Sequence, residues 1–295
     1  MFKNASGQVR SGWKVILAFL LMTILTGMFS VPIGIFMLIT DRNMITSMES
    51  NPGTDFFMML TQMLAVILTV FICLRLEGKK WKDVGITSLR SQGNNVMFGL
   101  FLGAASIVFI TFIMMVTKQI TLNPAKITPS LLTTIGIYFI GFIFVAVNEE
   151  LFFRGYVISV LRQTKSYPII YLASGLVFGL VHIGNPNVHV LGIVNVCLIG
   201  LLFAYMFIQL KSLWMPMGYH LTWNFFQGNI LGFNVSGKAG NGFFHINSAD
   251  NIWTGGTFGV EASVWTTVFI ALGFFITKIY INRFKHVNDS EELVV

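Results

Sequence analysis

Long apolar stretches alternate with short polar segments along the whole chain. Most of these stretches approach the ~20 residues that an α-helix needs to cross the hydrocarbon of a bilayer. The pattern predicts eight transmembrane helices, at about residues 14–40, 55–75, 96–117, 131–153, 168–184, 188–210, 213–232 and 260–282. We find no internal repeat and no second soluble domain, so we expect one all-α integral membrane domain over residues 1–295.

The composition supports a polytopic membrane protein. Hydrophobic residues make up 55% of the chain and charged residues only 11%, which does not describe a soluble domain of this length. The 19 Lys and Arg exceed the 12 Asp and Glu, but the basic residues lie between apolar stretches and form no stripe with interleaved aromatics. We therefore expect the lipid bilayer as a partner and no nucleic acid, and we assign no oligomeric state.

The basic residues are distributed unequally between the two sides of the predicted membrane. Most fall on the side of the termini, whereas the opposite loops hold Arg42, Lys118, Lys126 and Lys238. The positive-inside rule therefore predicts a multi-pass protein of the cell membrane with both termini in the cytoplasm.

Three polar segments follow from this topology. Residues 77–95 are expected to form either a short interfacial helix or an ordinary loop on the cytoplasmic side. Residues 234–258, rich in Gly and Asn, are expected to form an outer loop. The acidic segment 286–295 is predicted to be a disordered cytoplasmic tail.

Several polar side chains lie inside the apolar stretches, where they are costly. Ionisable groups at membrane depth usually face a bundle interior or a water-filled cavity, so their default interpretation is a functional site. The candidates are Glu149, Glu150, His182, His220 and Asn224.

The densest of these motifs is the segment 148–155, with the sequence NEELFFRG. Glu150 and Arg154 are four residues apart, the spacing of a helical ion pair that would keep a buried acid charged. Glu149 points about 100° away on the same helix and is left free to face a cavity. The alternative is that both acids merely pair with Arg154.

The two histidine motifs each place a polar group on one helical face. Phe178 precedes His182 by four residues, and His220 precedes Asn224 by four. At 1.5 Å per residue, Glu149 lies about 20 Å from the loop at Arg162, and the groups of the other two helices lie at a similar depth. The three polar faces can therefore meet inside the bundle.

This ordered set of motifs resembles the CPBP family of membrane proteases, also called the Abi family, which includes the type II CAAX prenyl endopeptidases. The resemblance covers residues 149–224 and rests on two glutamates followed by arginine, then Phe-x-x-x-His, then His-x-x-x-Asn. It implies a protease core at about residues 131–232 with an intramembrane catalytic cavity. Substrates of the family include prenylated CAAX proteins and bacteriocin or pheromone precursors, and nothing in the residues chooses among them.

The resemblance also assigns roles to the candidate residues. It implies that Glu149 and His182 activate the attacking water and that His220 and Asn224 stabilise the oxyanion. It implies supporting roles for Glu150, Arg154 and Phe178.

The same side chains suit peptide hydrolysis on chemical grounds. The reaction needs a base for water, an acid for the leaving amine and donors for the oxyanion, which a carboxylate, two imidazoles and a carboxamide supply. Glu149, His182 and His220 could also supply three ligands to zinc, with a fourth position for water. The HExxH signature is absent from the sequence, and we favour metal-independent catalysis with no required cofactor.

The sequence therefore predicts an intramembrane endopeptidase that acts on a membrane-associated or lipidated peptide or protein. One alternative is a membrane scaffold, or a bacteriocin-immunity or regulatory protein of the same fold, which would not need costly groups at one depth. A second is a proton-coupled transporter, but the chain shows no sign of the inverted repeat that many transporters have.

Other polar residues are given structural interpretations. Glu261 begins the last apolar stretch, where an acid is favoured by the helix dipole. Asn195 is expected to bond across helices, and Asn185 is expected to be a loop residue at the outer mouth of its helix.

Overall fold

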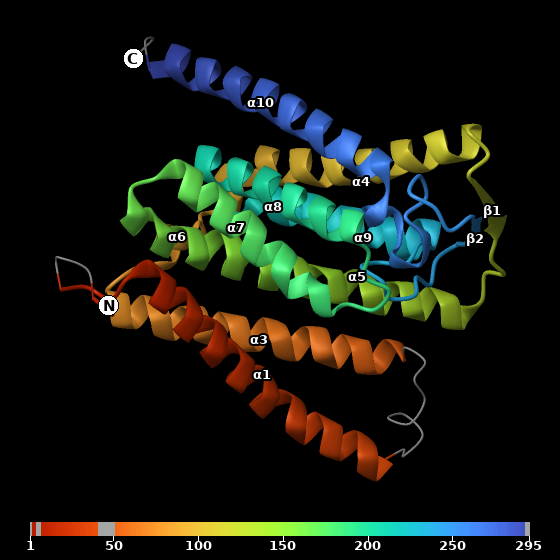
Figure 1. The fold of residues 1–295 in the computed structure, drawn as a ribbon, viewed down its shortest axis with the longest axis horizontal. Helices are drawn as coiled ribbons and strands as arrows, with labels where there is room; N and C mark the ends of the chain where they lie inside the picture. The colour runs from red at the N-terminus through yellow and green to blue at the C-terminus, as the bar shows by residue number, and fades with distance from the viewer. Residues whose placement is uncertain (1, 4–6, 41–50, 293–295) are drawn as a thin grey trace.

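Helices account for nearly all the regular structure in the computed structural model, which describes residues 2–3, 7–40 and 51–292 (Figure 1). The helices are α1 Ser11–Thr40, α3 Pro52–Glu77, α4 Gly93–Val116, α5 Pro129–Glu149, α6 Val157–Leu161, α7 Tyr167–Val181, α8 Val190–Leu210, α9 Trp214–Phe225 and α10 Val264–Glu292. Two π-helical segments, Glu150–Tyr156 and Phe226–Leu231, continue α5 and α9.

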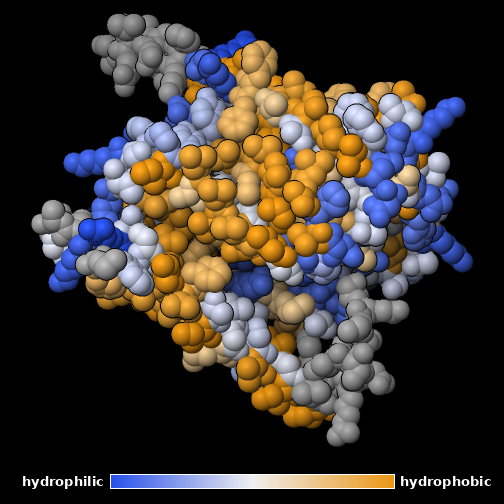
Figure 2. All heavy atoms as spheres, viewed as in Figure 1, coloured by the Kyte–Doolittle hydropathy of each residue, from blue (hydrophilic) through white to orange (hydrophobic). Residues whose placement is uncertain are grey.

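Seven helical segments of the described residues are long and apolar enough to cross a membrane, which confirms the predicted polytopic membrane protein. Apolar side chains cover the middle of the visible face, and hydrophilic residues gather toward its two ends (Figure 2). The remaining predicted stretch, residues 213–232, forms α9 and its π-helical extension.

Helix α9 lies inside the bundle, against α4, α5 and α8. It carries His220 and Asn224, and Gln227 follows in the π-helical extension, with all three side chains buried. Because these groups would be costly in lipid, the bundle interior is the environment that such a segment requires. The bundle is completed by α3 against α5, α7 against α8, α1 against α3, and α10 against α8.

Both ends of the described chain lie at the same end of the bundle. Figure 1 shows the first turn of α1 and the last turn of α10 on the left, whereas the strand pair lies on the right. The arrangement agrees with an even number of crossings if α9 is included. The cytoplasmic location of the termini stays a prediction.

Glycines let α4 approach the backbone of α9. A Cβ atom at Gly99 would collide with the carbonyl oxygen of Met215, and one at Gly103 would collide with the carbonyl oxygen of Tyr219. The Thr222 hydroxyl donates to the Leu100 carbonyl at 2.8 Å across this contact. Such close packing through small residues is typical of helix pairs in membranes, and here it fixes the helix that carries His220 and Asn224.

The structure adds detail to two of the predicted polar segments. Part of the predicted outer loop is strand β2, Phe244–Ser248, which pairs antiparallel with β1, Ile120–Pro124, so that backbone groups at this end satisfy one another. Helix α10 is drawn to Glu292 and so includes residues 286–292, and the disorder that the sequence predicts for this tail stays a prediction. Each residue added to a formed helix contributes one backbone hydrogen bond, so the helix can outlast the apolar stretch. Residues 293–295 lie outside the described residues.

The segment between α3 and α4 is a packed loop rather than an interfacial helix. It contains two 3-10 turns, Trp81–Val84 and Leu89–Gln92. Val84 is fully buried, and the Leu213 amide donates to the Gly85 carbonyl at 3.1 Å. The loop therefore packs against the start of α9 and holds it at the end of the bundle that is predicted to be cytoplasmic.

The α4–α9 contact predicts that Gly103→Ala lowers the thermal stability of the protein in detergent, because the new methyl group must push α9 away. Gly136→Ala in α5 is the control, since nothing lies within 4 Å of the position of its Cβ. We expect that variant to be neutral or slightly more stable, because alanine favours helix. Equal melting temperatures for the two variants would contradict the close approach.

Candidate active site

The site begins where α5 changes into the π-helical segment Glu150–Tyr156, all seven residues of which are buried. Such wider turns are rare and occur frequently at functional sites. The Arg154 Nη1 donates to Glu150 Oε1 at 3.0 Å, and neither side chain is exposed. The predicted ion pair is therefore present inside the bundle.

Two aromatic rings complete the surroundings of Arg154. Its guanidinium carbon lies 4.0 Å from the centre of the Phe178 ring and 5.2 Å from that of Phe203. Ring faces attract a cation most strongly where water is excluded. Glu150 and the two rings offset part of the loss of hydration at this charge, while the Arg154 Nε and Nη2 atoms are buried without a hydrogen-bond partner among the described residues.

Both candidate histidines are oriented through Nδ1. His182 Nδ1 lies 2.7 Å from the carbonyl oxygen of Phe178, and His220 Nδ1 lies 3.0 Å from Glu150 Oε1. A carbonyl oxygen and an ionised carboxylate can only accept hydrogen bonds, so Nδ1 is the donor in each ring. In a neutral ring, Nε2 is then left with its lone pair free.

The two Nε2 atoms converge on one oxygen of Glu149. Glu149 Oε2 lies 4.0 Å from His182 Nε2 and 3.8 Å from His220 Nε2. This oxygen is buried and has no hydrogen-bond partner within the described part of the chain. The gaps exceed a direct hydrogen bond but suit a bridging water, which needs about 2.8 Å to each neighbour.

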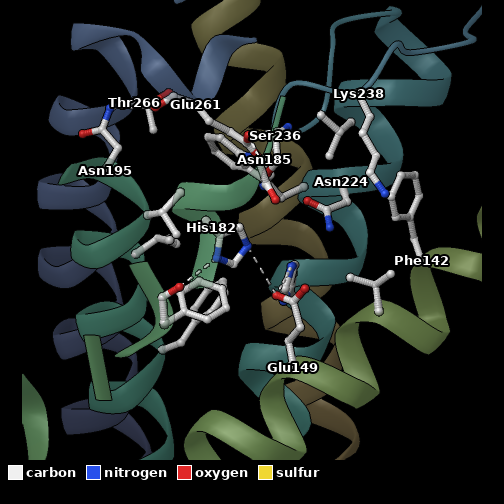
Figure 3. A pocket seen from close by; sticks show the side chains of 18 of the residues that line it. Phe142, Glu149, His182, Asn185, Asn195, Asn224, Ser236, Lys238, Glu261 and Thr266 are labelled. Carbon is white, nitrogen blue, oxygen red and sulfur yellow. Dashed lines mark hydrogen bonds and ion pairs between the residues drawn. The ribbon is translucent and has the colours of Figure 1, made fainter. Parts of the chain in front are cut away.

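Asn224 lies on the same cavity, one turn beyond His220. Its side chain is 6% exposed, and its amide points into the cavity above Glu149 (Figure 3). The cavity has a volume of about 240 Å³ and is lined from α3, α5, α7, α8, α9, α10 and the segment after α9. The structure thus brings Glu149, His182, His220 and Asn224 together, with Glu150 and Arg154 behind them.

The same three groups do not fit a zinc ion as they are placed. Two tetrahedral ligands about 2.1 Å from zinc stand about 3.4 Å apart, which is less than either separation from Glu149. No group of three His, Cys, Asp or Glu among the described residues is placed to hold a metal ion. The Nδ1 hydrogen bonds of the two rings would also suit histidines that bind a metal. The distances from Glu149 Oε2 to the two Nε2 atoms are therefore the observation that favours a bridging water over zinc.

Glu261 is a cavity residue that the sequence interpretation missed. It lies in the turn Val260–Ala262 before α10, is 9% exposed, and lines the cavity with Glu149. Burial raises the pKa of Glu261 to about 7, although hydrogen bonds from Ser236 act in the opposite direction. From the sequence, the position of Glu261 at the start of the last apolar stretch suggested only a favourable interaction with the helix dipole. The irregular segment that turns Glu261 toward the cavity has no recognisable sequence motif.

The segment after α9 contributes two more cavity residues, Ser236 and Lys238, which the sequence placed only in an outer loop. Asn185 also lines the cavity, beyond the loop role predicted for it. Asn195 donates to the Glu261 and Ser263 carbonyls at 2.7 and 2.9 Å, so it bonds across helices as predicted.

Comparison with known proteins finds a similarity to one family over part of the chain. Residues 130–226 match the family described as type II CAAX prenyl endopeptidase Rce1-like, a segment that contains every candidate site residue named from the sequence motifs. No curated protein and no solved structure matches the chain.

The buried ion pair predicts that Arg154→Met destabilises the protein by about 3–5 kcal/mol, because the variant leaves the Glu150 charge uncompensated inside the bundle. Thermal unfolding in detergent measures the effect. Arg90→Met serves as the control, since Arg90 is exposed on the loop before α4.

A second variant separates lost charge pairing from lost packing. Glu150→Gln combined with Arg154→Met removes both charges and should recover part of the stability. If Arg154→Met were as stable as Arg90→Met, the ion pair would not be the support that its geometry indicates.

Proposed function

We propose, from the similarity of residues 130–226 to the Rce1-like family of type II CAAX prenyl endopeptidases, that the chain is an intramembrane endopeptidase acting through water activated by Glu149. The observation that carries the proposal is the convergence of the His182 and His220 Nε2 atoms on one buried oxygen of Glu149. A pure scaffold has no need for three such groups around one gap.

The reaction begins with a water molecule held between Glu149 and His182. The Glu149 carboxylate takes a proton from this water as its oxygen attacks the carbonyl carbon of the scissile peptide bond. His182 Nε2 accepts the second hydrogen of the water, because Nδ1 is committed to the Phe178 carbonyl. This bond orients the water for attack.

Asn224 and His220 act on the negative charge that develops on the carbonyl oxygen. The Asn224 amide donates one hydrogen bond to this oxygen. His220 donates from Nε2 when its ring carries both protons. The positive charge of this form lies between two carboxylates, Glu150 at Nδ1 and Glu149 at Nε2. When the tetrahedral intermediate collapses, Glu149 gives its proton to the leaving amine, and the carbon–nitrogen bond breaks.

The proposed substrate is a peptide or protein associated with the membrane, including lipidated ones. The cavity is lined by apolar side chains such as Phe142, Val145, Val196 and Ile199 as well as by the polar cluster. A peptide segment with an apolar or lipidated neighbour can therefore lie next to the reacting groups without leaving an apolar environment. We further propose the cell membrane as the location, with both termini in the cytoplasm, from the distribution of basic residues.

The first test compares N- and C-termini of membrane proteins in host cells that carry the wild type, Glu149→Gln or His182→Ala at matched abundance. We expect termini that occur only with the wild type, since each variant removes a group that activates water. Identical termini in all three cells, with the wild-type phenotype retained in the variants, would favour a scaffold. Ion flux in proteoliposomes that survives Glu149→Gln without proteolysis would favour a transporter.

A second test concerns the metal. We expect the purified protein, dialysed against EDTA or treated with 1,10-phenanthroline, to cleave a substrate found in the first test at an unchanged rate, because Glu149 and the histidines stand too far apart for zinc. A loss of activity that returns with added Zn²⁺ would contradict metal-independent catalysis. Addition of Mg²⁺ is the control for nonspecific effects of chelation.

A further inference from the structure

A tight turn brings one lysine to the mouth of the cavity. The Val235 amide donates to the Lys238 carbonyl at 2.8 Å, and the Lys238 amide donates to the Val235 carbonyl at 3.0 Å. Between them, Ser236 and Gly237 have φ values of 49° and 83°. Two left-handed residues in succession are typical of the two-residue turns of β-hairpins, and a serine in this conformation needs support from its surroundings.

The turn is held from three sides. The Gly237 amide donates to the Phe258 carbonyl at 2.8 Å, and Asn187 Nδ2 donates to the Gly237 carbonyl at 3.2 Å. A Cβ atom at Gly237 would collide with the Pro186 carbonyl oxygen. Glycine is therefore required here, and the turn is wedged between the loop after α7 and the segment before α10.

Glu261 supplies the third support. Its Oε2 accepts hydrogen bonds from the Ser236 amide at 2.6 Å and from the Ser236 hydroxyl at 2.9 Å. The carboxylate thus holds the backbone next to Lys238 rather than pairing with its ammonium group.

The Lys238 side chain is exposed, and it extends from this support along the lining of the cavity. In Figure 3 it runs beside the Phe142 ring toward the level of Asn224. It lines both the main cavity and a smaller adjoining one of about 50 Å³, with which the main cavity shares Met59, Phe142 and Val235. The lysine therefore stands where the two spaces meet.

The charge of Lys238 is not neutralised by a neighbour. No carboxylate within the described residues forms an ion pair with it. Asp55 lines the smaller cavity, but its Oδ2 accepts from the Tyr138 hydroxyl at 2.6 Å. Lys238 is also the one Lys or Arg among the described residues that line the main cavity, where Glu149 and Glu261 are the acids.

We propose that Lys238 binds a carboxylate of the substrate peptide and so sets where the chain is cut, with Ser236 and Glu261 as positioning residues for it. The carboxylate is an Asp or Glu side chain or the carboxyl terminus of the peptide. This inference rests on the proposed endopeptidase function. A lysine at the end of a span often extends to lipid headgroups, but this one, although exposed, lines the cavity from a clamped turn.

The test uses the full-length protein in detergent and a proteome-derived peptide library, with cut sites read by mass spectrometry. We expect the wild type to favour peptides with an acidic group at a fixed distance from the cut. Lys238→Met should lose this preference, and Lys238→Glu should replace it with a preference for basic residues. Lys126→Met is the control, since Lys126 is exposed like Lys238 but lines neither of the two cavities.

Synthetic peptides identify the carboxylate. From one well-cut library peptide we would make versions with the acidic residue changed to its amide and with an amidated carboxyl terminus. The peptide that lacks the carboxylate bound by Lys238 should have a kcat/KM about tenfold to a hundredfold lower with the wild type, since a hydrogen bond to a charged group contributes on this scale. With Lys238→Met, the same change in the peptide should leave kcat/KM unchanged. Ser236→Ala should show a smaller loss of this preference than Lys238→Met.

Three outcomes would overturn the inference in distinguishable ways. Equal charge preference in the wild type and Lys238→Met would remove the role of Lys238 while leaving the protease function intact. In a repeat of the assay in vesicles with and without phosphatidylglycerol, a Lys238 effect that depends on this lipid, whatever the peptide charge, would assign the lysine to a lipid headgroup. No Glu149-dependent cutting of any library peptide would count against the proposed function itself, and the inference would fall with it.

Discussion

The structure depends on keeping one carboxylate charged inside an apolar bundle. Glu150 has no exposure, and an uncompensated charge at such a site would cost several kcal/mol. Arg154 and the Nδ1 of His220 both bond to the same Glu150 oxygen, and the rings of Phe178 and Phe203 cover the guanidinium. The ion pair thus ties the π-helical segment after α5 to α7, α8 and α9, the helices that surround the candidate site.

The same network explains how two histidines come to share one orientation. Each ring donates from Nδ1 to an acceptor of the protein, Phe178 carbonyl in one case and Glu150 in the other, so that each Nε2 faces Glu149. The helices that carry them are held by close backbone packing, as where α4 meets α9 at Gly103. Geometry of this kind is set by packing and second-layer hydrogen bonds, which is what a site for a reactive water requires.

Hydropathy and spacing predicted the membrane spans and the residues that meet in the bundle, because both depend on local periodicity. The Glu150–Arg154 pair followed from a four-residue interval, and the depth of Glu149, His182 and Asn224 followed from the rise of a helix. Glu261, Ser236 and Lys238 could not be found this way, since irregular chain brings them to the cavity through left-handed turns and contacts with distant loops. The β1–β2 pair was not predicted for the same reason, because 119 residues separate the end of β1 at Pro124 from the start of β2 at Phe244.

Cleavage in water enriched in ¹⁸O tests the central claim most directly. A peptide spanning a Glu149-dependent cut site would be cleaved in a single turnover, and the label would then be located by mass spectrometry. Direct attack by water activated at Glu149 predicts one ¹⁸O atom in the new carboxyl terminus and none in Glu149. Label in the Glu149 side chain would mean that the carboxylate attacks the peptide itself, and an absence of cleavage by the wild type would contradict the account as a whole.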